Sequence, residues 1–172
     1  MKRITMTSLQ IKKIKTFNAR LFYRECLQDS AWPFSWQEER AYLQEALNEL
    51  PHLRLASDDD FIYFFAAPDS AEFSLQGTWV AKEIIGHAEI MGEEEFALYD
   101  LDQGSVYSMP LNLEMQEEPD LLTVIKIKEK YQELATWLEK EKISYSSTWR
   151  IVMQRRVKEN RLFCDFFLQI FE

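Results

Sequence analysis

The chain has 172 residues, and its 29 acidic side chains outnumber its 20 basic ones, for a formal net charge of −9 at pH 7. Hydrophobic residues make up 47% of the chain, which excludes intrinsic disorder, and the longest apolar run (61–67) is too short to span a bilayer. Four glycines exclude Gly-rich phosphate loops, and no apolar signal core follows Lys2 and Arg3, so we expect one cytoplasmic globular domain.

The N-terminal segment is basic and partly apolar. Residues 1–24 contain seven basic side chains and no acidic one. The spacing of Ile14, Leu21 and Phe22 predicts a helix over 9–28, and this basic helical element is expected to be part of the fold. The charge alone leaves other interpretations open: a targeting segment, a nucleic-acid arm, a membrane-surface helix, or a segment that packs on the protein's own acidic surface.

A second helix and a strand follow. Ser35-Trp36-Gln37-Glu38 has the pattern of a capping box, in which a hydroxyl and a carboxylate satisfy free backbone amides, and Pro51 ends the predicted helix. The aromatic run 61–67, bounded by aspartates, predicts a buried strand. Residues 78–91 favour one or two strands, divided at Gly86.

The next segments complete an α+β fold. Residues 95–101 and 105–111 predict a hairpin around Asp102-Gln103-Gly104, with Gly104 at positive φ and apolar residues on both faces. An apolar stripe predicts a helix over 121–141, and alternation predicts strands over 147–156 and 161–171 around Lys158-Glu159-Asn160, although 162–171 could also be helical. The fold class is therefore α+β: a mostly antiparallel sheet with two or three helices packed against it.

The charge of the central block suggests a binding surface. Residues 29–120 hold most of the acids, and the segment 25–120 has 22 acidic and three basic residues. The carboxylates occur in runs, which together would create a strong negative field if the fold gathered them on one side. The candidate partner-binding residues are these runs and two nearby tryptophans: Asp58, Asp59, Asp60, Glu93, Glu94, Glu95, Glu117, Glu118, Trp32 and Trp36.

Residues that could carry catalysis are sparse. Cys26 and Cys164 are far apart in sequence among apolar neighbours, which is typical of buried structural thiols. His87 lies between Glu83 and Glu89, at spacings that would place two or three ligands near a metal on either a strand or a helix. No second histidine and no known metal or nucleophile motif accompanies them, so the sequence predicts no cofactor, metal or catalytic residue.

These patterns favour a non-catalytic protein whose acidic surface binds a basic macromolecule, of the immunity, antitoxin or regulator kind. The partner could be a nuclease or another nucleic-acid-binding protein, since their clefts are built for phosphate. The alternative is a small metal-dependent or carboxylate-based hydrolase that uses the region of Glu83, His87 and Glu89. Direct nucleic-acid binding through the basic ends is disfavoured by the net charge.

Overall fold

The computed structural model describes residues 10–25, 36–56, 61–65, 79–86, 95–112 and 121–172. These residues form one antiparallel sheet of nine strands and two helices, which agrees with the expected α+β class. The helices are α2 (Trp36–Glu49) and α3 (Leu121–Lys140). The strands are β1 (Lys12–Thr16), β2 (Ala19–Glu25), β3 (Arg54–Leu55), β4 (Phe61–Phe65), β5 (Trp79–Ile85), β6 (Ala97–Leu101), β7 (Gly104–Leu111), β8 (Trp149–Lys158) and β9 (Arg161–Phe171).

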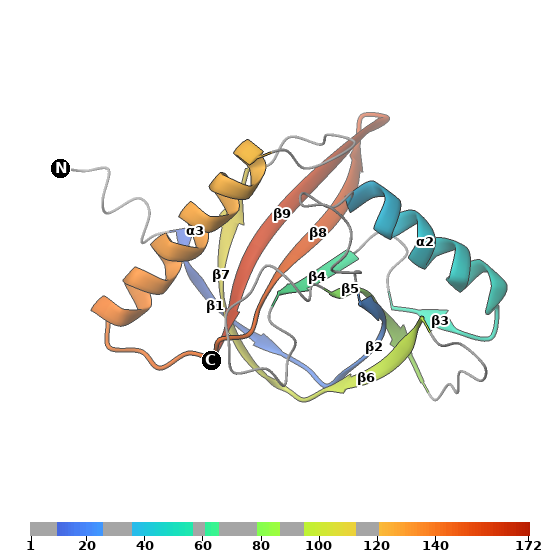
Figure 1. Ribbon diagram of the computed structural model, residues 1–172, viewed down its shortest axis with the longest axis horizontal. Coiled ribbons are helices and arrows are strands. Elements are labelled where there is room, and N and C mark those ends of the chain that lie inside the picture. The colour runs from blue at the N-terminus through green and yellow to red at the C-terminus, as the bar shows by residue number, and fades with distance from the viewer. Residues whose placement is uncertain (1–9, 26–35, 57–60, 66–78, 87–94, 113–120) are drawn as a thin grey trace.

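The sheet curls because both ends of its strand order belong to one long ribbon. The order is β1-β7-β9-β8-β4-β5-β2-β6, with β3 beside β5. Strand β1 runs on into β2 and β6 into β7, and the pairing of the two keeps one register from Lys12↔Ser108 to Tyr23↔Ala97. Figure 1 shows the resulting curve, with both helices outside it. The sheet therefore has a convex face toward the helices and a concave face that neither helix covers.

The main hydrophobic core lies between the helices and the convex face. Leu43 and Leu47 of α2 and Leu134 and Leu138 of α3 are buried in it with side chains of six strands. Trp149 of β8 is fully buried in this layer, and its ring lies 4.8 Å from that of Tyr131. The apolar stripe of each helix faces this core, so burial of these stripes fixes where the helices pack.

Charged side chains are buried beneath α2. Arg24 of β2 and Glu39 of α2 form an ion pair of 3.4 Å, and each residue is only 8% exposed. The Arg24 guanidinium also lies 4.7 Å from the ring of Tyr42. Lys82 of β5 is fully buried, with its ammonium 4.5 Å from the ring of Phe61. The aromatic rings give these cations a favourable electrostatic environment away from water.

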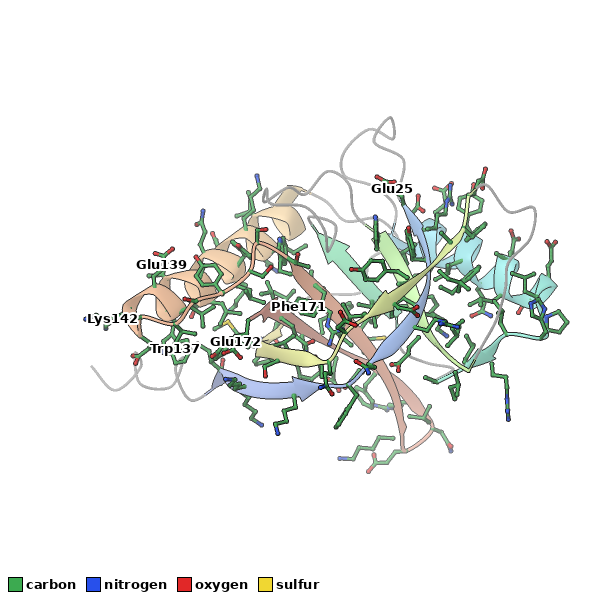
Figure 2. The ribbon with its side chains drawn as sticks, turned by 90° about the horizontal axis from the view of Figure 1, so that it is seen from below. Glu25, Trp137, Glu139, Lys142, Phe171 and Glu172 are labelled. Carbon is green, nitrogen blue, oxygen red and sulfur yellow. The ribbon has the colours of Figure 1, made fainter. Side chains whose placement is uncertain are left out.

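The segment after α3 returns the chain to the sheet. Lys142 has a φ of 58°, and the Ile143 amide donates to the Leu138 carbonyl at 2.9 Å. Tyr145 donates to Glu139 at 2.8 Å; burial and this hydrogen bond raise the pKa of Tyr145 to about 12. Figure 2 shows Glu139 near this end of α3 and Glu172 at the end of β9.

The predicted N-terminal helix over 9–28 is wrong within the described residues, where β1 and β2 stand instead. The reason is that both faces of β2 are buried. Leu21 belongs to the concave face and Phe22 to the main core, so adjacent apolar residues replaced the expected alternation and imitated helical spacing. The segment is part of the fold, as expected, and three of its bases pair with the chain's own acids: Lys13 with Glu172, Arg20 with Asp100, and Arg24 with Glu39.

The predicted hairpin between 95–101 and 105–111 is also wrong. Both segments are strands, but β6 pairs with β2, and β7 pairs with β1 and β9. Asp102 and Gln103 interrupt a nearly continuous strand instead of reversing it. Gly86, and not Gly104, is the described glycine with positive φ. The short polar interruption resembles a turn in sequence, because the partner strand that keeps it extended lies about 80 residues away.

The other predicted elements are confirmed where the structure describes them. Helices α2 and α3 occupy the expected ranges, β4 lies within 61–67, and β5 lies within 78–91. Strands β8 and β9 pair around Glu159-Asn160. Apolar residues cover both faces of the sheet, as the two-sided pattern of 95–101 predicted.

Candidate functional site

The concave face carries its own hydrophobic cluster, built only from strands. Its buried members are Leu21, Ile62, Trp79, Ala81, Leu101 and Val152. Ala19, Tyr23, Tyr99 and Phe171 pack against them and are partly buried. These residues alternate with main-core residues along each strand, because successive side chains of a strand point to opposite faces.

Aromatic rings gather on one side of this cluster. The rings of Tyr23 and Trp79 are stacked, with centroids 3.9 Å apart and planes at 14°. Tyr99 meets Trp79 edge-on, at 5.5 Å and 70°. Trp79 is buried, whereas Tyr23 and Tyr99 are half-buried. We call Tyr23, Trp79 and Tyr99 the aromatic cluster; the half-buried rings of Tyr23 and Tyr99 are the parts of it that solvent reaches.

A hollow of about 510 Å³ lies where β2 begins and where β5 and β6 end, and residues of both faces of the sheet line it. Ala19 and Leu101 line it and also belong to the concave cluster. Leu21 lies opposite Glu83 on one side and opposite Tyr99 on the other, so one row of the sheet joins the hollow to the aromatic cluster.

The hollow has an excess of negative charge. Its charged lining residues are Arg20, Glu83, Asp100 and Asp102. Arg20 and Asp100 form a two-point ion pair, with Nε–Oδ1 at 2.7 Å and Nη2–Oδ2 at 3.2 Å, and the hydrogen bond to Asp100 raises the pKa of Arg20. Neither Glu83 nor Asp102 forms an ion pair with another of the described residues. Glu83 and Asp102 therefore give the hollow its excess negative charge, although Glu83 also acts on the charge of Arg150.

Gly86 shapes the rim of the hollow. Its φ is +81°, a conformation that other residues adopt only with strain, although an added Cβ would meet no atom within 4 Å. Arg20 donates to the Gly86 carbonyl at 3.4 Å. Backbone conformation, and not lack of space, thus requires glycine where β5 ends.

A polar row crosses the other wall of the concave face. Arg150 of β8 donates to Gln169 of β9 at 2.8 Å, and Gln169 donates to Ser108 of β7 at 3.2 Å. The Arg150 guanidinium also lies 5.1 Å from the ring of Phe171. Burial lowers the pKa of Arg150 to about 10, while the charge of Glu83 acts to raise it. Arg150 therefore stays positive at neutral pH, and the concave face has walls of opposite charge.

Most of the predicted partner-binding residues lie outside the described residues. Asp58, Asp59, Asp60, Glu93, Glu94, Glu117, Glu118 and Trp32 do so. Glu95 is exposed just before β6, and Trp36 begins α2, with its side chain outside the description. The structure therefore does not bring these residues together or separate them, and binding of a basic partner by an acidic face stays a prediction.

The described residues also do not test the alternative of a metal site. Glu83 is an exposed residue of β5, but His87 and Glu89 lie outside the described residues. Among the residues that the structure does describe, no group of three potential metal-ligating side chains occurs. Neither described helix is long and apolar enough to cross a membrane.

The sequence patterns did not indicate the concave site. The spacing around Tyr23 predicts a helix, and no local pattern links Arg150 to Gln169. The available signal was the alternation of Ala19, Leu21 and Tyr23, which places three residues on one strand face.

Comparison with known proteins finds similarity in structure alone. No family model and no curated protein matches the sequence. The EcmrR chain of an EcmrR–DNA complex in EcmrR-RPo is similar in structure, with a TM-score of 0.65 and 8% identity, over 98% of this chain and 61% of that one. The likeness is to a known fold, and it does not identify a family.

Two further solved structures are similar to this chain over nearly their whole length. The EcmrR C-terminal domain matches with a TM-score of 0.62 and 10% identity over 95% of this chain and 97% of that domain. SAV2435 bound to tetraphenylphosphonium matches with a TM-score of 0.50 and 6% identity over 94% and 93% of the two chains. The chain thus spans 61% of the EcmrR chain but nearly all of its C-terminal domain.

Proposed function

We propose that this chain binds a small aromatic organic cation on the concave face of its sheet. The observation that carries the proposal is that one row of the concave face, formed by Glu83, Leu21 and Tyr99, joins the aromatic cluster to a hollow whose lining has an excess of negative charge. Aromatic faces attract cations and stack on apolar rings, and the carboxylates supply the opposite charge. Pockets of this kind combine an apolar lining with a few polar groups that set ligand orientation.

The fold likeness supports this proposal without proving it. SAV2435 is described with tetraphenylphosphonium bound, a cation whose charge is shielded by four phenyl rings. At 6% identity the likeness extends only to the fold. The inference to this chain therefore depends on its own residues: the rings of Tyr23, Trp79 and Tyr99, and the carboxylates at the rim.

The expected contributions of the rings and carboxylates to the binding free energy are large enough to give a measurable affinity. A cation placed over a tryptophan or tyrosine ring gains about 0.5–2 kcal/mol, depending on how dry the site is. A carboxylate a few ångströms away adds a similar amount at the surface of a protein. Together with apolar burial, these terms suit affinities in the micromolar range, about −8 kcal/mol.

Two ions of the same shape and opposite charge test the proposal. We expect tetraphenylphosphonium to quench tryptophan fluorescence or release heat on titration, and to bind at least about tenfold more tightly than tetraphenylborate, about 1.4 kcal/mol. Glu83→Gln should weaken phosphonium binding about fivefold and leave borate binding unchanged or stronger. Glu45→Gln, which removes an exposed carboxylate of α2 on the convex side, is the matched control and should change neither.

Two outcomes of these titrations would contradict the proposal. If neither ion binds, the concave face is not a ligand site of this type. If both bind equally and Glu83→Gln has no effect, the acidic hollow does not select for positive charge.

A further inference from the structure

Strands β8 and β9 extend beyond the rest of the sheet as a two-stranded arm. The pairing of β4 with β8 stops at Met153, and the pairing of β7 with β9 stops at Phe166. From Gln154↔Asp165 to Lys158↔Arg161, the two strands pair only with each other among the described strands. Figures 1 and 2 both show this hairpin projecting from the body of the molecule. We call residues 154–165 the arm.

The arm has a defined tip. Glu159 and Asn160 have φ values of 53° and 60°, which makes a two-residue turn with both residues in the left-handed region. Such turns match the right-handed twist of the two strands, so they continue the ribbon without splaying it. The five residues from Gln154 to Lys158 extend about 17 Å at roughly 3.4 Å per residue.

The charge of the arm is opposite to that of the chain. It holds four bases (Arg155, Arg156, Lys158 and Arg161) against two acids, whereas the whole chain has a net charge of −9. Lys158 and Arg161 are exposed and lie directly opposite each other at the tip. At physiological salt the Debye length is about 8 Å, so charges farther than this from the tip act on it only weakly.

The arm also exposes apolar side chains. Val157 is 73% exposed and Phe163 is 41% exposed. Isolated exposed residues need no explanation, but here two lie within one short ribbon beside four bases. A partner that offers both anionic groups and apolar contacts would cover them.

We propose that the arm binds double-stranded nucleic acid. A two-stranded ribbon fits the major groove, which is about 12 Å wide, and arginine and lysine pair with the phosphates that line it. Val157 and Phe163 can contact base methyl groups or sugars in the groove. This inference differs from the expectation drawn from net charge, because it depends on the local positive charge of the arm. It does not depend on the proposed ligand site.

The test compares two variants of equal net charge. Fluorescence anisotropy with a labelled DNA duplex of about 20 base pairs, in about 50 mM salt, should give a micromolar dissociation constant for the full chain. Lys158→Gln/Arg161→Gln should weaken binding about tenfold and lower the slope of log K against log salt by about 2, close to 0.9 for each lost phosphate contact. Lys126→Gln/Lys128→Gln, on exposed positions of α3, is the control and should leave binding unchanged.

Each other outcome overturns the proposal. No binding in low salt would exclude the arm as a nucleic-acid site. Equal losses in both double variants would mean that net charge, and not the arm, attracts the duplex. Binding to vesicles of anionic lipid that is lost in the arm variant, with no duplex binding, would assign the arm to a membrane surface instead. Circular dichroism of both variants checks that the fold is retained.

Discussion

Some single residues of this fold carry charge in buried places, where desolvation of the charge is unfavourable. Arg24 and Glu39 are each 8% exposed and connect β2 to α2. Desolvation of two ions is repaid only by their mutual attraction and by further contacts, such as that of Arg24 with the Tyr42 ring. Removing one partner leaves the other as an uncompensated buried charge, which costs more than the pair contributes.

We therefore expect Glu39→Gln to lower the free energy of unfolding by about 3 kcal/mol, measured by urea denaturation. Glu49→Gln, at an exposed position of the same helix, should change it by less than about 0.5 kcal/mol. The double variant Arg24→Met/Glu39→Gln should recover part of the loss, because no unpaired ion then remains. A loss that is equal for Glu39 and Glu49 would mean that the pair is not buried as described.

At the scale of elements, the turn of the arm is held in a conformation that its first residue does not favour. Glu159 adopts a positive φ, which costs a residue other than glycine or asparagine roughly 1 kcal/mol. Asn160 is better suited to the same region. The pairing of β8 with β9 fixes both residues there, because the register from Trp149↔Ile170 to Lys158↔Arg161 leaves only two residues for the turn.

Glu159→Asn should raise the free energy of unfolding by about 0.5 kcal/mol, and Asn160→Ala should lower it by about 1 kcal/mol. Thermal unfolding of the two variants, side by side with the parent, measures both. A stabilising Asn160→Ala would contradict the left-handed turn. Neither substitution should alter phosphonium binding, because the arm lies outside the concave site.

Elements that depend on local chemistry were predictable from the sequence. The capping-box pattern in the sequence 35–38 and the stop at Pro51 predict the range of α2, and β9 alternates along its length. Strands β1 and β2 were not predictable in this way. Leu21 and Phe22 are buried on opposite faces, so the strand lost its alternation, and only a partner distant in sequence decides between strand and helix.

The candidate site was less predictable than the fold. Tyr23, Trp79 and Tyr99 come from three strands, and nothing in their separate neighbourhoods signals that their rings meet. Arg150 and Gln169 lie opposite each other because of the β8–β9 register, which the sequence did indicate. The net charge draws attention to the acidic runs, whereas Glu83 stands out in the sequence only as a neighbour of His87.

At the scale of the whole molecule, curvature depends on a contact between distant segments. The long ribbon changes neighbours where Phe17 and Asn18 lie across from Asp102 and Gln103, between the pairs Thr16↔Gly104 and Ala19↔Leu101. There the backbone amide of Gln103 donates to the side-chain oxygen of Asn18 at 2.7 Å. This bond replaces a ladder hydrogen bond and keeps the two halves of the ribbon in one register, which brings the hollow and the aromatic cluster onto the same concave face.

Asn18→Ala should therefore loosen the ribbon at this point while leaving its ends paired. A hydrogen bond of this kind contributes about 1 kcal/mol, so the Gln103 amide should exchange with deuterium about fivefold faster than in the parent. The amides of Ile151 and Leu168, in the centre of the β8–β9 pair, serve as internal controls and should keep their rates. Because Asn18 also lines the hollow, phosphonium affinity should fall by a similar factor. If the Gln103 amide keeps its protection, the side chain of Asn18 does not bridge the ribbon, and the curl of the sheet must depend on strand pairing alone.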